Sequence, residues 1–458
     1  MNSFSRSIHC RSYRLVQSTL LIGMLAFVVP ASGFAQNRVL TLDDAVRIAV
    51  ENNRELIMAR LEMDKADYLV NEAYGTALPN LSASGTYTRA LKKPVFFLPD
   101  FQNPGSGRII PIEIGSDNSY QFGFTATQIL FNAAVFTGVG TARIYREASK
   151  HLYNEAYNKT VTETKQAFYG VLFARDVHRM IQASLENAER NLENVQLLFD
   201  QGIVSEYDLI RARVQTDNIR PSVIEAERNV LLVMNGLKLI LGLSPTESID
   251  PRGELDSIPN DDGLLDNAAR LVVERNASLR ALEEQTRVNE QLITIYRTES
   301  LPTLAAFGDY QWQAQNEHLG NLSTNDFVRS SQIGLALSLN IFNGMQTTAR
   351  VDQARVEHMK SQQQLGATRD ALTTNIENIR YRLEEARRRI DSQSMTVEQA
   401  EKGYAIATTR YQSGAGTQLE INDADLALMR ARVNRVQAVY DYLVAKADLE
   451  YMLSVHHP

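Results

Sequence analysis

Few residues of this 458-residue chain have the types and spacing that an active site requires. Four histidines are scattered, and His456 and His457 could bind a metal only weakly, on a tail that we expect to be flexible. Cys10 is the only cysteine, so there is no disulfide framework and no thiol chemistry. The sequence has no glycine-rich phosphate loop, so nucleotide hydrolysis is not expected. We therefore expect neither an enzyme nor a cofactor.

The remaining candidates lie beside two glycine-containing turns, one in each half of the chain. Glu420 and Asp423 form an acidic pair after the second turn, and Asp208 follows the first. On the residues alone, such acids are most often a solvated helix face. The two turns also hold glycines and hydroxyl-bearing N-cap candidates, which ordinary turn and cap chemistry explains: Gly202, Ser205, Gly414 and Thr417.

Long helical patterns lead into both turns. Apolar residues at spacings of mostly three and four run through 161–199 and again through 372–411, where an offset of 212 places Tyr411 on Phe199. This spacing is typical of a coiled-coil seam. Each helix would have about 65 residues and a length close to 100 Å. A return helix follows each turn, so the sequence predicts two long helical hairpins.

Four segments alternate strictly between apolar and small or polar residues, at about 80–90, 119–129, 303–313 and 331–341. Their length of about ten residues suits a tilted strand that crosses a bilayer, with Tyr120, Tyr310 and Trp312 in an interfacial girdle. A soluble sheet with one buried face has the same period, so the pattern alone leaves both open. Because four strands cannot close a membrane barrel, the membrane interpretation needs several chains.

The same order of strands and long helices occurs twice in the sequence. The stretch "ALPNLSASGTYT" resembles "SLPTLAAFGDYQ", and Phe-Asn pairs at 131–132 and 342–343 precede both long helices. We expect a first repeat at 36–245, a linker at 246–261, a second repeat at 262–453 and a tail at 454–458. Each repeat should begin with a helix, at 42–78 and 264–301. An irregular external loop, at 91–118 and 314–330, should join the strands of each pair.

The N-terminus predicts export. Three arginines precede an apolar run of about ten residues, and small residues lead to Ala35, which predicts a signal peptide at 1–35. Its removal would change the net charge from −7 to about −10, which makes nucleic acid an improbable partner. We find no other segment typical of a membrane helix.

Taken together, the duplicated strand entries "LPNL" and "LPTL", the junctions "LFN" and "IFN", and the tips "FDQGIVSEYDL" and "YQSGAGTQLEI" resemble the TolC-type outer-membrane efflux family. The resemblance implies an α+β membrane protein of the bacterial outer membrane. Three copies would supply four strands each to a twelve-stranded β-barrel, continuous with a coiled-coil tunnel in the periplasm. It also implies a passive duct that docks with a periplasmic adaptor and an inner-membrane pump of the RND or ABC type.

The resemblance gives the turn residues roles. Glu420 and Asp423 match carboxylates that line the constriction, where a threefold ring would attract cations and raise carboxylate pKa values. Asp208 and Tyr411 match positions that hold the gate closed, and the two glycines and two N-caps match adaptor contacts. Gly416 stands where some members have arginine, which puts a salt-bridge lock there in doubt.

A second hypothesis remains. The same pattern could belong to an exported coiled-coil scaffold or adhesin with a soluble sheet and no channel.

Overall fold

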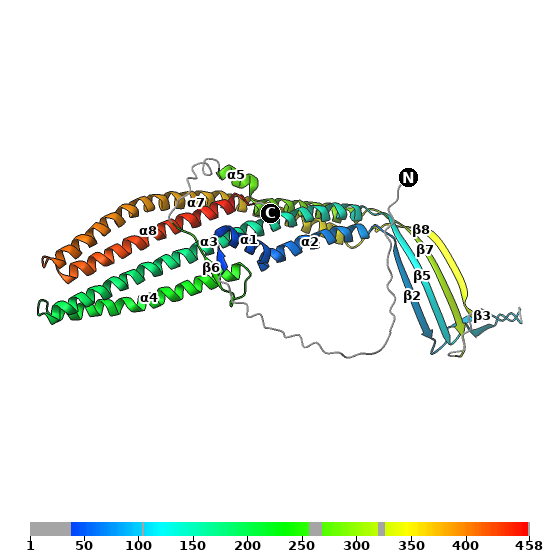
Figure 1. Cartoon of the computed structure of the whole chain (residues 1–458). Coiled ribbons are helices and arrows are strands. Elements are labelled where there is room, and N and C mark those ends of the chain that lie inside the picture. The colour runs from blue at the N-terminus through cyan, green and yellow to red at the C-terminus, as the bar shows by residue number, and fades with distance from the viewer. Residues whose placement is uncertain (1–37, 103–104, 256–267, 319–325, 457–458) are drawn as a thin grey trace, which may run out of the picture.

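The computed structural model describes residues 38–102, 105–255, 268–318 and 326–456. The expected signal peptide lies outside these residues, as do parts of the expected linker and of the second repeat's first helix. The molecule is elongated, with a sheet at one end and two helical hairpins at the other (Figure 1). None of the helices in the described ranges combines the length and the apolar character needed to cross a bilayer.

Both hairpins have one very long arm and one shorter return arm. The first consists of α3 (Ala133–Asp200) and α4 (Glu206–Ile240), and the second of α7 (Gln346–Gln412) and α8 (Gln418–Met452). With 68 residues, α3 is about 100 Å long. The tips of the two hairpins lie at the end of the molecule away from the sheet (Figure 1).

The seams predicted from sequence are turned inward. On α7 the buried residues include Ile376, Ile379 and Leu383, and on α3 they include Phe168 and Val171. They belong to a core that lies midway along the molecule and also takes in the ends of the return helices. This core holds together the parts of both hairpins that lie furthest from the tips.

Each expected single helix before a strand is instead a pair of helices. The first pair is α1 (Leu42–Asn52) and α2 (Arg54–Gly75), and the second is α5 (Ala268–Arg275) and α6 (Ala277–Thr298). The expectation of unbroken helices over 42–78 and 264–301 was therefore wrong. In both pairs an asparagine between the helices causes the break.

Asn53 and Asn276 act alike. Each has an extended ψ, of 124° and 121°, and each side chain accepts a hydrogen bond from the backbone of the following helix. Each amide then donates to a carbonyl at the end of a return helix: Asn53 Nδ2 to Ile240 O at 2.8 Å, and Asn276 Nδ2 to Met452 O at 3.1 Å. One side chain thus ends a helix, caps the next and ties both to a hairpin.

The sheet has four antiparallel strands in the order β2 (Asn80–Arg89), β5 (Asn118–Phe131), β7 (Thr303–Asn316) and β8 (Val328–Ser338). Its register brings the four predicted apolar faces to one side. Tyr87 lies opposite Tyr120, Phe122 opposite Trp312, and Gly308 opposite Ile333. Within this chain β2 and β8 are the edges of the sheet.

The two sides of the sheet differ in chemistry. On one side the expected girdle residues Tyr310 and Trp312 touch, with ring centroids 4.6 Å apart, and Phe122 and Phe124 pack against the same indole. On the other side polar side chains bond across strands. Thr125 Oγ1 and Gln332 Nε2 both donate to the Asp309 carboxylate, at 2.7 and 3.2 Å, and Gln121 donates to Gln311 at 2.8 Å. The sheet is therefore apolar on one side and hydrogen-bonded on the other.

The segment between β2 and β5 is not an irregular loop, as expected, but contains a second hairpin, β3 (Val95–Pro99) and β4 (Ile109–Glu113). Both strands are mostly apolar on both faces, so their sequence lacks the alternation that predicts a half-buried strand. Pro99 and Pro111 lie in these strands, and a two-stranded hairpin tolerates proline because each strand has an open edge. The last sheet strand is displaced too, since β8 begins at Val328 and ends at Ser338.

The chain ends are tied to the middle of the molecule. β1 (Arg38–Leu40) pairs in parallel with β6 (Ile249–Pro251), which lies in the expected linker. The expected flexible tail is also held, as far as it is described. His456 N donates to Asn158 Oδ1 at 3.2 Å, and its ring lies 3.4 Å from Glu450. His457 lies outside the described residues.

Candidate functional site at the hairpin tips

The first tip is a capped turn. Gly202 has a φ of 72°, a left-handed conformation that favours glycine, and Ser205 caps α4. Asp208 completes the capping box: its carboxylate accepts from Ser205 N at 3.3 Å, while Asp208 N donates to Ser205 Oγ at 3.2 Å. The predicted gate residue Asp208 therefore serves the turn of its own hairpin in the single chain.

The second tip is built in the same way, with an added ion pair. Gly414 has a φ of 75°, and Thr417 caps α8 by accepting from Glu420 N at 3.3 Å. Arg410 closes the turn, since its guanidinium donates to Ala415 O at 3.1 Å and lies 3.7 Å from the Glu420 carboxylate. Asp423 follows one turn later and is exposed. Glu420 and Asp423 thus share one side of α8.

The tip glycines differ in what they need. A Cβ at Gly202 or Gly414 would meet no atom within 4 Å, so within this chain only the backbone conformation requires glycine. At Gly416 a Cβ would lie 2.9 Å from Tyr411 N and 3.1 Å from Arg410 Cβ. Gly416 is therefore required by close packing, which explains why this chain cannot carry arginine there without moving the turn.

Tyr411 joins the two hairpins. Its ring packs on the tip cluster, which we define as three buried residues of the first hairpin, Val195, Leu209 and Ala212, with the half-buried side chains around them. Its hydroxyl is buried and has no hydrogen-bond partner among the described residues. Burial, and then the charge of Asp208, raises the pKa of Tyr411. A phenol so placed stays protonated and can donate a hydrogen bond to a group that the single chain does not supply.

Sequence reasoning missed a polar contact further from the tips. Ser184 Oγ donates to Asp425 Oδ2 at 2.6 Å, and Asn187 Nδ2 donates to Asp425 Oδ1 at 3.1 Å. Burial, and then the charge of Asp425, raises the pKa of nearby Tyr404. A lone aspartate on a helix gives no sequence signal of such a contact, because its donors lie on another hairpin.

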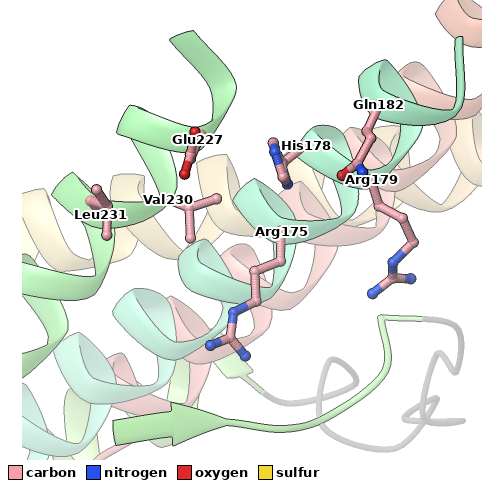
Figure 2. Close-up of a pocket in the computed structure, with 7 residues that line it drawn as sticks. All are labelled: Arg175, His178, Arg179, Gln182, Glu227, Val230 and Leu231. Atoms are coloured by element: carbon pink, nitrogen blue, oxygen red, sulfur yellow. The ribbon is translucent and has the colours of Figure 1, made fainter. Parts of the chain in front are cut away.

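A groove of about 400 Å³ lies between α3 and α4 above the tips (Figure 2). It opens beside His178, the one imidazole on the predicted seam. The arginines at its edge already have partners: Arg175 pairs with Asp250 at 2.9 Å, and Arg179 with Asp176 at 3.0 Å. Their charges are thus neutralised within the chain. In the described ranges no three His, Cys, Asp or Glu side chains are grouped to hold a metal.

Comparison with known proteins gives the context for these tips. A family model described as outer membrane efflux protein matches residues 45–243 and 268–454. The chain is 22% identical over 410 residues to the outer membrane protein TolC of Salmonella enteritidis, covering 88% of this chain and 79% of that protein. It is also 22% identical over 396 residues to the cobalt-zinc-cadmium resistance protein CzcC of Cupriavidus metallidurans, covering 86% and 85%.

Solved structures share the fold. The crystal structure of the outer membrane protein VceC from Vibrio cholerae superimposes with a TM-score of 0.73 at 16% identity, covering 90% of this chain and 96% of that one. The Campylobacter jejuni CmeC outer membrane channel gives a TM-score of 0.71 at 19% identity, covering 90% and 85%.

Proposed function

Since the chain belongs to the outer membrane efflux protein family, we propose that it is the outer-membrane exit duct of a tripartite efflux or type I secretion-like system. In this proposal it is a passive channel and not an enzyme. Three copies each contribute β2, β5, β7 and β8 to one twelve-stranded barrel that contacts outer-membrane lipid, and their helical hairpins form a tunnel in the periplasm.

The observation that carries this proposal is the uncovered apolar side of the sheet. Ile333, Leu335 and Leu337 of β8 are 91%, 67% and 71% exposed in the single chain. Open strand edges are not tolerated in lipid, so β2 and β8 must pair with other copies if the apolar side faces lipid. A soluble scaffold or adhesin would have to cover this side, and no described element does so. The uncovered face therefore favours the duct.

The two halves support the assembly. Each has a pair of helices divided by an asparagine, two sheet strands and a long hairpin, in the same order. We infer an internal duplication, with 36–245 and 262–453 as the repeats. Under threefold symmetry each chain would then supply two similar units to a ring of six.

We place the gate at the tips. Glu420 and Asp423 would form rings of like charge around the axis, and Tyr411 with Asp208 would restrain the closed state. The unpartnered Tyr411 hydroxyl supports this role, because a neighbouring copy could supply its acceptor. Gly202, Ser205, Gly414 and Thr417 would contact a periplasmic adaptor. Their exposed, small side chains leave room for another helix.

The partners would be this adaptor and an inner-membrane pump of the RND or ABC type.

Single-channel conductance of the purified trimer in a planar bilayer tests the duct, and a Glu420→Ala/Asp423→Ala variant tests the gate. We expect small cation-selective openings whose selectivity falls in the variant. Unchanged selectivity would remove these two acids from the gate. If well-folded protein gives no channels and carbonate extracts it from membranes, the scaffold is correct.

A further inference from the structure

The packing between the hairpins thins toward the tips. On α8, the helix that packs on α3, the central core ends at Val436, and four residues nearer the tip are buried: Ala431, Leu428, Ile421 and Gln418. On α3, Ser184 is the last buried residue before Val195. Segments with few buried apolar contacts open at low free-energy cost. Between the central core and the tip cluster the two hairpins are therefore held by only a few buried apolar side chains, which belong to neither cluster.

Asp425 lies in this thinly packed stretch. Both of its carboxylate oxygens accept hydrogen bonds from α3, one from Ser184 and one from Asn187. A carboxylate only accepts hydrogen bonds, and bonds to a charged group are among the stronger ones in proteins. Among the described residues, no other hydrogen bond between the two hairpins is nearer the tips. The bond pair is thus the last directional contact before Tyr411.

We propose that Asp425, through Ser184 and Asn187, is the pivot that holds the hairpins together and confines their separation to the tip segments, which we define as residues 188–216 and 401–424. Opening the tips then bends each hairpin beyond Asp425 and leaves the core unchanged. The restraint itself follows from the contacts within one chain. Its part in opening a channel rests on the proposed function. Asp425 acts here as a positioning residue, because it holds α8 against α3 through Ser184 and Asn187.

Hydrogen exchange of the full-length trimer in detergent, followed by mass spectrometry, measures this restraint directly. Asp425→Ala should speed exchange of amides in the tip segments roughly tenfold, because it removes two bonds to a charge. Exchange in 160–180 and 372–390 should not change. The matched control is Asp217→Ala, which removes an exposed acid from α4 and should change neither region.

A mutant cycle, with Asp425→Ala as one change and Ser184→Ala/Asn187→Ala together as the other, separates a pivot from general destabilisation. Adding Ser184→Ala and Asn187→Ala to Asp425→Ala should cause no further acceleration, because the bonds are already absent. Additive effects would overturn the pairing. Unchanged tip exchange in Asp425→Ala, or faster exchange along the entire hairpins, would overturn the pivot.

Conductance of the same variants distinguishes the two proposals. Faster tip exchange together with larger or more frequent openings supports both. Faster tip exchange without any channel in variant or parent supports the restraint and contradicts the duct. Larger openings without faster exchange would contradict the pivot and support the duct.

Discussion

At the residue scale, the tips are fixed by backbone geometry as much as by charge. Gly202 and Gly414 need a left-handed conformation, whereas Gly416 needs space. These requirements are independent of any gate, because they are satisfied within one chain. The acids that the family resemblance singles out are attached to turns that have little freedom to change.

Gly416→Ala tests this close packing. The added methyl group would lie 2.9 Å from Tyr411 N, so the turn must move, at a cost of about 1–3 kcal/mol. We expect faster proteolytic cleavage at the second tip and a lower melting temperature. Gly403→Ala is the control, because a Cβ there meets nothing within 4 Å and alanine favours a helix by about 1 kcal/mol. Equal behaviour of the two variants would contradict the packing argument.

Asn276 provides a second test at this scale. Asn276→Ala removes an N-cap acceptor and the donor to Met452 O, and we expect a loss of about 1–3 kcal/mol in thermal unfolding. Asn276→Ser keeps an N-cap acceptor and loses the amide donor, so its melting temperature should fall between those of the parent and the alanine variant. A serine variant as unstable as alanine would mean that the cap contributes nothing.

At the element scale, Glu450 joins α8, α3 and the C-terminal segment. Lys165 Nζ lies 2.5 Å from its carboxylate and the His456 ring lies 3.4 Å away. Burial alone would raise the pKa of Glu450, but the bonds from His456 and Lys165 outweigh it and lower the pKa to about 2. The folded state therefore binds this proton less tightly than the unfolded state does.

The pH dependence follows from that direction. The stabilisation, about 3 kcal/mol, is present above the unfolded pKa of about 4.5 and is lost as the pH falls toward 2. We expect Glu450→Gln to lower the melting temperature at pH 7 and to make less difference at pH 3. Glu357→Gln is the control. Glu357 forms an exposed ion pair with Lys360 on α7, so its replacement should change the melting temperature little at either pH. A Glu450→Gln effect that does not depend on pH would exclude this ionic origin.

Periodicity in the sequence predicted elements well where one face is apolar. The structure has strands that overlap all four predicted positions, with β8 displaced by three residues, and helices along both seams, and the family model confirms the resemblance. Prediction failed where the pattern carries no period. The β3–β4 hairpin is apolar on both faces, and Asn53 and Asn276 break helices through bonds to carbonyls 187 and 176 residues away. Asp425 was missed for the same reason.

At the scale of the whole molecule, the apolar side of the sheet decides between duct and scaffold. Leu335→Lys places a charge on that side, which costs about 2–4 kcal/mol at the middle of a bilayer. We expect a smaller amount of the heat-sensitive trimer in outer membranes. Ala336→Lys, one residue along and on the other side, is the control and should assemble normally. If both variants assemble equally, the apolar side does not face lipid.

The register of the sheet also sets an order of events during synthesis. β2 pairs with β5 and β7 with β8 across short connections, but the central pair joins Asn118 to Asn316. β1 likewise cannot pair with β6 until Ile249 has been synthesised. Long-range pairs form slowly, because loop closure precedes any gain. Two apolar hairpins must therefore persist separately in water before they meet, and their unpaired strand edges are exposed to aggregation during this interval.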